Sequence, residues 1–276
     1  MFYRVGIRCI ILNILFWNLG KNDNSQYLAQ CINERKIDFA ILSEYENLNI
    51  SYVLHKLNNK YRHIPGMGGC DKITMLALND IDVHIQREQT RYAMYSVEKD
   101  GIDLIIVGTH LQDRRNSDSA QRISTAGRLM NDLENLEKRK QCKKSVIIGD
   151  LNANPYDEEL LQMNAFHAVL FKDVIKAAET RTIGGIRYRR LYNPILHFLS
   201  EDTKNYGSYY NTQESSTPTW HCLDQILVSK ALADTIKSLE YLRSIGNSSL
   251  IAQQKPKREI SDHLPLFIQI EVMGEQ

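Results

Sequence analysis

Short apolar runs alternate along the chain with segments of helical periodicity. Residues 9–17 (CIILNILFW) and 38–43 (DFAILS) have the length and composition of buried strands, whereas 119–139 repeats its apolar residues at helical spacing. Bounded runs of strand-forming residues predict further strands at 72–79, 81–87, 91–97, 102–109, 145–149, 223–229 and 264–271. A hairpin turn is expected at Lys99-Asp100-Gly101. This alternation predicts an α/β protein with a mixed sheet, folded as a single domain over 1–276.

Residues 180–221 show no regular period. They contain Gly184-Gly185, a tyrosine-rich stretch and a Ser/Thr cluster, and the tyrosines are Tyr206, Tyr209 and Tyr210. A segment of this length without a pattern is usually functional or disordered in a compact domain. We therefore expect a long irregular insertion here.

Composition excludes several classes of protein. The chain has 276 residues, of which 43% are hydrophobic, and its 34 basic and 33 acidic residues give a net charge of +1. Such a balance excludes a polycationic protein but allows a local basic patch. The five cysteines are scattered without a C-x-x-C pair, which argues against a disulfide framework and a zinc finger. No apolar run approaches the ~20 residues that span a bilayer, and we expect a cytoplasmic protein with reduced thiols and no stable membrane association.

Polar residues of one kind follow or precede the predicted strands. Each is ordinary alone, because Asp and Asn favour turns, but together they can converge on one rim of a sheet. Their side chains supply oxygen donors and imidazoles. The set comprises Asn18, Glu44, His110, Asp150, Asn152, Asp224, Asp262 and His263.

The chemistry of this set favours a hard divalent cation. Carboxylate and amide oxygens suit Mg²⁺ or Mn²⁺ better than zinc, and no cysteine pair accompanies the histidines. Such a cation together with carboxylates and two imidazoles is suited to hydrolysis of a phosphate ester. The cation neutralises phosphate oxygens, a carboxylate orients water and the imidazoles stabilise developing charge.

The order and wording of these motifs resemble the endonuclease/exonuclease/phosphatase superfamily, which includes deoxyribonucleases, exonuclease III-like repair enzymes, sphingomyelinases and inositol polyphosphate 5-phosphatases. The strongest segments are GTHL (108–111), GDLNANP (149–155), LDQILVS (223–229) and SDHLPL (261–266), and the resemblance spans nearly the whole chain. It implies a four-layer α/β/β/α sandwich with two mixed β-sheets. It also implies a divalent-metal-dependent phosphodiesterase.

The resemblance assigns a role to each strand-end residue. It implies that Glu44 is the principal metal ligand, with Asn18 and Asp262 nearby. It further implies that Asp224 pairs with His263 and fixes its tautomer. The remaining roles concern the substrate: Asp150 orients the attacking water, Asn152 hydrogen-bonds the phosphoryl oxygen, and His110 contacts the scissile phosphate or assists the leaving group.

Three departures from the superfamily pattern limit the inference. Gly20 stands where many members carry an acidic residue, so the number of metals, one or two, stays open. Gln225 replaces the arginine usual in inositol phosphatases, and Thr217-Pro218-Thr219-Trp220 is displaced from their TP-x-W position. These differences disfavour an inositol phosphatase.

The segment 181–192 (RTIGGIRYRRLY) is the candidate substrate contact. It carries Arg187, Arg189 and Arg190 with interleaved tyrosines, which suits a nucleic-acid backbone, but a solvated surface loop explains it equally well. Arg114 and Arg115 fit an exposed turn slightly better than a substrate contact. We therefore expect a nuclease acting on DNA or RNA.

Two alternatives remain open. A lipid phosphodiesterase would favour an exposed apolar hairpin, for which 191–199 is the only candidate, and core packing explains that run better. A catalytically inactive binding module is disfavoured because Glu44, Asp150, Asp224 and His263 are all present. The sequence leaves open the oligomeric state, DNA against RNA, and endonuclease against exonuclease.

Overall fold

The computed structural model describes residues 9–201, 207–212 and 219–274, and two mixed sheets dominate it. The first sheet has the order β16 (Ile236–Tyr241), β21 (Leu266–Met273), β1 (Cys9–Asn18), β2 (Phe39–Ser43), β4 (Ile73–Leu78), β3 (Tyr61–Ile64). The second sheet has the order β5 (Asp82–Gln89), β6 (Tyr92–Lys99), β7 (Ile102–His110), β8 (Ser145–Asp150), β15 (Asp224–Val228), β12 (Leu191–Tyr192), β9 (Ala168–Val169).

Helices and short strand pairs surround the two sheets. The helices are α1 (Ser25–Arg35), α2 (Ile50–Lys56), α3 (Ser119–Lys140), α4 (Glu158–Leu161), α5 (Lys172–Ala177), α6 (Ile195–Glu201) and the 3₁₀ turn η1 (Lys230–Leu232). The short pairs are β10 (Thr180–Ile183) with β11 (Ile186–Arg189), β13 (Tyr209–Tyr210) with β14 (Trp220–His221), β17 (Ser244–Ile245) with β18 (Ser248–Ser249), and β19 (Ile251–Ala252) with β20 (Lys255–Pro256).

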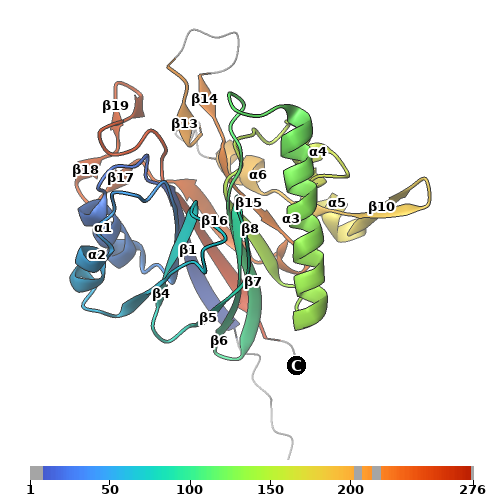
Figure 1. Cartoon of the computed structure of the whole chain (residues 1–276), viewed down its shortest axis with the longest axis horizontal. Helices are drawn as coiled ribbons and strands as arrows, with labels where there is room; N and C mark the ends of the chain where they lie inside the picture. The colour runs from blue at the N-terminus through green and yellow to red at the C-terminus, as the bar shows by residue number, and fades with distance from the viewer. Residues whose placement is uncertain (1–8, 202–206, 213–218, 275–276) are drawn as a thin grey trace, which may run out of the picture.

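The elements stack in four layers. Figure 1 shows α1 and α2 outside the first sheet and α3 outside the second, with the two sheets face to face between them. Alternate residues of β8 explain why: Val146 and Ile148 belong to the large core between the sheets, and Ile147 belongs to the smaller core under α3. The expected four-layer α/β/β/α sandwich with two mixed sheets is confirmed.

The two sheets approach each other closely at Gly108, where a side chain is missing. A Cβ on Gly108 of β7 would lie 2.7 Å from Ile73 Cγ2 and 2.9 Å from Ile41 Cγ2 of the first sheet. Gly108 is two residues before His110, so this contact fixes the spacing of the sheets beside the polar residues at the strand ends. A larger residue at this position would separate them.

The segment 180–221 differs from the sequence expectation. Its described part is not irregular, because it contains the β10–β11 hairpin, β12 of the second sheet, α6 and the β13–β14 pair. The strands are too short to show a period. Tyr206, Thr217 and Pro218 lie outside the described residues. Leu191 and Ile195 are buried and Phe198 packs against the core, so the apolar run 191–199 serves packing.

The predicted hairpin turn is confirmed. Lys99 ends β6 and Ile102 begins β7, while Asp100 and Gly101 both have positive φ, the conformation of a two-residue hairpin turn. Among the described residues, no helix combines the length and the apolar character needed to cross a bilayer.

Candidate active site between the two sheets

Strand topology explains why residues far apart in the sequence meet. Parallel strands present their carboxyl ends at the same edge, and β7 and β8 are parallel, with His110 opposite Asp150. β15 runs antiparallel to β8, so its first residue, Asp224, pairs with Asp150. In the other sheet Asn18 ends β1, and Glu44 follows β2, which is parallel to β1.

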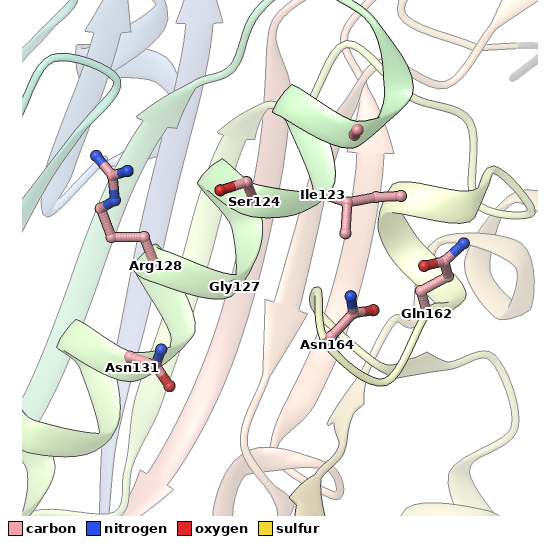
Figure 2. A pocket seen from close by; sticks show the side chains of 8 residues that line it. Ile123, Ser124, Gly127, Arg128, Asn131, Gln162 and Asn164 are labelled. Atoms are coloured by element: carbon pink, nitrogen blue, oxygen red, sulfur yellow. The ribbon is translucent and has the colours of Figure 1, made fainter.

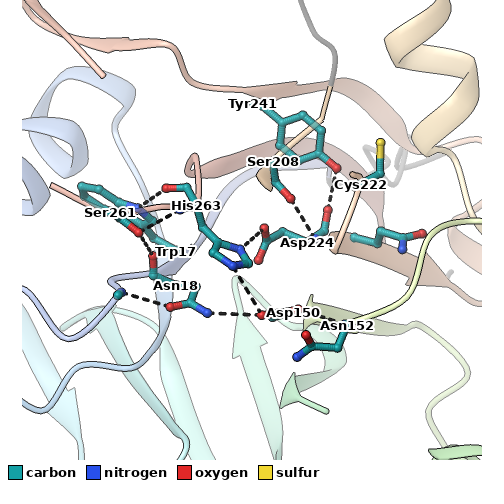
Figure 3. Close-up of polar contacts among 12 residues, drawn as sticks. Trp17, Asn18, Asp150, Asn152, Ser208, Cys222, Asp224, Tyr241, Ser261 and His263 are labelled. Carbon is teal, nitrogen blue, oxygen red and sulfur yellow. Dashed lines mark hydrogen bonds and ion pairs between the residues drawn. The ribbon is translucent and has the colours of Figure 1, made fainter. Parts of the chain in front are cut away.

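A buried His–Asp pair forms the centre of the site. His263 Nδ1 lies 2.7 Å from Asp224 Oδ2, and the other ring nitrogen, Nε2, lies 3.9 Å from Asp150 Oδ2 (Figure 3). All three residues are buried. The Asp224 carboxylate therefore fixes the ring so that Nε2 faces Asp150.

Burial and neighbouring charge act in opposite directions on this histidine. Burial alone lowers the pKa of His263, but the Asp224 carboxylate, with further contributions from Asp150 and Asp262, raises the pKa to about 10. Burial raises the pKa of Asp224, against the effect of the His263 imidazole. Since the carboxylates outweigh burial, they favour the protonated form of the His263 imidazole.

Asp150 collects contacts from both sheets. Its Oδ2 accepts a hydrogen bond from Asn18 Nδ2 at 3.2 Å and lies 3.7 Å from His110 Nε2. Its Oδ1 accepts the backbone N–H of Asn152 at 2.9 Å. Because Asn18 belongs to the first sheet and Asp150 to the second, the site lies at the seam between them.

Glu44 has an unusual backbone conformation for its residue type. Its φ is +48°, a region that costs a residue with a Cβ energy unless the surrounding structure imposes it. Its side chain is 29% exposed, and Oε1 lies 3.8 Å from His110 Nε2. Such strain at a partly exposed carboxylate is typical of a functional position.

The loop after β8 is fixed from beneath. Asn152 also has a positive φ, +48°, and its Nδ2 donates to the Leu111 carbonyl at 2.9 Å. Gln225 Nε2 donates to the Ala153 carbonyl at 2.5 Å, and Gln225 Oε1 accepts from Asn193 Nδ2 at 2.7 Å. The glutamine at the position of the phosphatase arginine is thus buried and used to hold this loop.

Gly20 lies against Asp262, and any side chain there would crowd this carboxylate. A Cβ at Gly20 would lie 3.3 Å from Asp262 Oδ1 and 3.3 Å from Ser261 Oγ, and its φ is +59°. Among the described residues, no recorded hydrogen bond or ion pair joins Asp262 to Glu44 or Asp150. The structure thus brings Asp262 to Gly20 and next to His263, without direct contact to the other acidic side chains.

Several supporting residues escaped sequence analysis. Trp17 Nε1 donates to the His263 carbonyl at 3.2 Å, and Ser261 Oγ accepts the His263 N–H at 3.0 Å. The Tyr209 ring lies 5.0 Å from the His263 ring, and Tyr241 donates its hydroxyl to the Asp224 carbonyl at 2.7 Å. Trp17 lies in the first predicted strand, Ser261 in the SDHLPL segment and Tyr209 in the tyrosine-rich stretch, but their contacts with His263 are tertiary, so the sequence did not reveal these roles.

The three arginines of the expected substrate loop are not brought to this site. Arg189 is 7% exposed and binds Glu137 Oε2 at 2.6 Å, with Ser145 Oγ at 3.5 Å from its Nη2. Ser145 and Asp150 are the two ends of β8, which a strand of this length separates by roughly 17 Å. Arg190 donates to the Ala178 carbonyl, and Arg187 is exposed on β11.

Arg114 and Arg115, a few residues after His110, form ion pairs around an exposed turn. Arg114 Nη2 lies 3.9 Å from Glu159 Oε2 and also pairs with Asp157, while Arg115 lies 3.5 Å from Asp113. This agrees with the interpretation of both residues as parts of an exposed turn.

A hollow of about 620 Å³ lies elsewhere, between α3 and the turn at 162–164 (Figure 2). Gly127 makes it possible, because a Cβ there would meet the Asn164 carbonyl. Its lining contains polar residues such as Arg128 and Asn131 but no carboxylate and no histidine. This hollow therefore lacks the acid–base and metal-binding groups that gather at the strand ends.

The donor set fits a divalent cation. The recorded ion pairs of Glu44, Asp150 and Asp224 involve only His110 and His263, and among the described residues no lysine or arginine pairs with them. With Asp262 added, four carboxylates lie near two imidazoles, so the negative charge exceeds what the imidazoles can neutralise. Asp150, Asp224 and His263 place ligand atoms within 4.8 Å of one another, and the hydrogen bond between Asp224 and His263 uses the Nδ1 atom of the imidazole.

Comparison with known proteins gives structural matches only. No protein-family model and no curated protein sequence matches the chain. Truncated TDP2 of Caenorhabditis elegans superposes with a TM-score of 0.60 at 14% identity, covering 95% of this chain and 98% of that one. TDP2 of D. rerio, complexed with a single-strand DNA product, gives 0.59 at 14% identity over 96% and 99%.

A third match carries the family name. An endonuclease/exonuclease/phosphatase family protein from Bacteroides thetaiotaomicron gives a TM-score of 0.58 at 12% identity and covers 96% of this chain and 98% of its own. These matches extend over almost the full length of both partners. The chain has the fold of the endonuclease/exonuclease/phosphatase superfamily.

Proposed function

We propose that the chain is a divalent-metal-dependent phosphodiesterase that hydrolyses the backbone of a nucleic acid. One observation carries the proposal: carboxylates and imidazoles from both sheets collect at one seam, and no described lysine or arginine pairs with the carboxylates. An anionic phosphate is repelled by such a seam unless a cation accompanies it. Glu44, with Asn18 and Asp262 nearby, would hold Mg²⁺ or Mn²⁺, which suit oxygen ligands.

The cation, when bound, neutralises charge on a phosphoryl oxygen. The chain's own groups supply the remaining functions. Asp150 Oδ2 faces both imidazoles and Asn18 Nδ2, so it is placed to orient a water molecule and accept its proton. His263, held by Asp224, donates from Nε2 to charge that develops on phosphate.

Two further side chains complete the proposed site. Asn152 presents an amide next to Asp150 on a loop fixed by Leu111 and Ala153, and it would hydrogen-bond a phosphoryl oxygen. His110 Nε2 lies within 3.8 Å of carboxylates of both Glu44 and Asp150, and it would assist the leaving group.

Three features support nucleic acid over a lipid or an inositol phosphate. The apolar run 191–199 packs into the core and offers no membrane-inserting hairpin. Gln225 is buried, hydrogen-bonds the loop that follows β8, and does not supply the cation that inositol phosphatases have at this position. The D. rerio TDP2 structure with the same fold holds a single-strand DNA product.

The test compares substrates under one set of conditions. Purified chain with Mg²⁺ is expected to cleave single- or double-stranded DNA or RNA, and bis-p-nitrophenyl phosphate more slowly. It should not cleave inositol polyphosphates or sphingomyelin. Excess EDTA should abolish cleavage, and excess Mg²⁺ should restore it.

Asp82→Asn serves as the control variant, because Asp82 is exposed and pairs only with His84 among the described residues. It should cleave like wild type. Full activity in excess EDTA, or cleavage of sphingomyelin but no nucleic acid, would contradict the proposal.

A further inference from the structure

A groove of about 380 Å³ opens beside the seam and is lined by both the β13 region and the segment 252–259. Asp262 belongs to its lining, and the next residue, His263, belongs to the site. Consecutive strand residues point to opposite faces. Tyr209 accordingly packs on His263, while Tyr210 lines the groove and stacks edge-on against Trp220 at 5.3 Å. The groove therefore adjoins the site at Asp262.

The charged lining of the groove is mostly basic. Lys255, Lys257 and Arg258 contribute three cations, against the carboxylates of Glu259 and Asp262. Lys255 and Lys257 are half-buried, and within the described ranges no ion pair is recorded for either ammonium group. Their positive charge is therefore available to attract an anion into the groove.

Hydrogen bonds hold the backbone of the segment that carries these cations in place. The Asn22 and Asn24 side chains donate to the carbonyls of Arg258 and Ile260, at 3.1 and 2.7 Å, and the Ile260 N–H donates to the Lys257 carbonyl at 2.8 Å. These hydrogen bonds tie the segment that carries the three cations to the loop after β1, the strand that ends at Asn18. Preorganised cations lose little entropy when they bind an anion.

We propose that this groove binds the phosphate backbone of a single nucleic-acid strand on one side of the scissile phosphate, with Lys255, Lys257 and Arg258 contacting phosphates and Tyr210 contacting a base. The inference rests on the proposed function and names a substrate contact for it. Alternating phosphates and bases match a lining that mixes cations with one aromatic ring. The chain is otherwise almost neutral, so these cations are not part of a general positive surface.

The test measures binding without hydrolysis. A labelled 20-nucleotide single strand is titrated in EDTA at several salt concentrations, with wild type, with the groove variant Lys255→Gln/Lys257→Gln/Arg258→Gln, and with the control variant Lys138→Gln/Arg139→Gln/Lys140→Gln. The control removes the same charge from exposed positions on α3. Circular dichroism and thermal melting verify that each variant is folded.

The groove variant is expected to bind more weakly, and its log–log salt slope should fall by about 0.7 for each lost contact with a single strand. The control variant should keep the wild-type slope. Oligonucleotide cleavage in Mg²⁺ should fall more than cleavage of bis-p-nitrophenyl phosphate, because the small diester does not extend into the groove.

An unchanged slope in a folded groove variant, or an equal loss in both variants, overturns the proposal. So does a groove variant that loses binding to inositol hexakisphosphate or to phosphatidylserine vesicles but not to the oligonucleotide. Absence of all diester cleavage by wild type refutes the proposed function instead, and the binding measured in EDTA distinguishes the two failures.

Discussion

The two ends of β8 carry buried acidic clusters of opposite character. At the Ser145 end, Glu137 is fully buried, and its carboxylate accepts from Ser145 Oγ and Arg189 Nη1, both at 2.6 Å, with Lys143 at 3.7 Å. At the Asp150 end, the partners of the carboxylates are imidazoles, amide N–H groups and the Ser208 hydroxyl, and no described lysine or arginine pairs with them. One cluster balances its charge within the protein, and the other does not.

This difference separates a structural group from a functional one. A buried carboxylate that finds arginine and a hydroxyl contributes to folding, and its removal leaves the partner uncompensated. Carboxylates whose charge the neighbouring imidazoles balance only in part destabilise the fold, and such a cost is typical of functional positions. The position of Arg189 follows the same logic: its charge is already used, so it is not free for substrate.

The largest effect is expected at the balanced end. Glu137→Ala removes the carboxylate that lies 2.6 Å from the buried Arg189 guanidinium and leaves it with the more exposed Glu179 at 3.5 Å, so it should lower the free energy of unfolding by about 3–5 kcal/mol. Urea denaturation measures the loss. The double variant Glu137→Leu/Arg189→Met should recover much of it, because no charge remains buried. A single variant as stable as wild type would show that the cluster is not structural.

The unbalanced end should respond in the opposite way. Asp150→Asn removes charge with little change of shape, and turnover should fall by at least about 10²-fold, which corresponds to about 2.7 kcal/mol. The melting temperature should stay equal or rise, because charge repulsion decreases. Steady-state kinetics and calorimetry on the same preparation check both statements. Loss of activity accompanied by unfolding would contradict the comparison.

A smaller effect should appear at Glu44. Glu44→Gln keeps the shape of the side chain and removes one anionic oxygen donor, so the affinity for Mg²⁺ should fall by roughly tenfold. The concentration of Mg²⁺ at half-maximal activity measures it, and Glu46→Gln, two residues away and 52% exposed, is the control. Equal Mg²⁺ dependence in both variants would remove Glu44 from the metal site.

The smallest effect concerns pH at the balanced end. His167 Nδ1 lies 3.0 Å from the Arg189 carbonyl, and burial lowers the pKa of His167. The unfolded chain therefore binds a proton more readily than the folded protein, so this residue's contribution to stability is full above pH ~6.5 and is lost as the pH falls below it.

Comparison of variants isolates that contribution. His167→Gln should show a smaller loss of stability than wild type between pH 7.5 and 5.5 in urea denaturation. His84→Gln, at an exposed position, should behave like wild type. The same pH dependence in all three proteins would show that His167 does not titrate in this range.

The sequence predicted the elements that have strong patterns. The buried strands, α3 and the Asp100-Gly101 turn were visible because hydrophobic period and turn chemistry are local properties. The prediction missed β16 and β3 of the first sheet and the short strands within 180–221, and the last of these are too short to show a period. The four-layer arrangement came from the resemblance of the motifs, since no local pattern specifies how two sheets pack.

The sequence predicted which residues belong to the site but not how they are arranged in space. Strand-end Asp, Asn, Glu and His residues were recognisable, and the structure joins Asp224 to His263 and Asn18 to Asp150. The sequence could not predict that Arg189 pairs with a carboxylate or that lysines line a groove. Both features depend on which distant segments pack beside these residues. A cluster of arginines in sequence does not reveal whether its charge is already neutralised.

The pairing of β1 with β21 has a consequence for how the protein becomes active. Phe16 lies opposite Leu266, so 250 residues separate these partners, and contacts of this separation form slowly. During synthesis, the segment that carries Asp262 and His263 emerges after almost all of the fold has been translated. The two halves of the seam are thus joined late, and a nascent chain that has already built its second sheet does not yet hold the imidazole opposite Asp150.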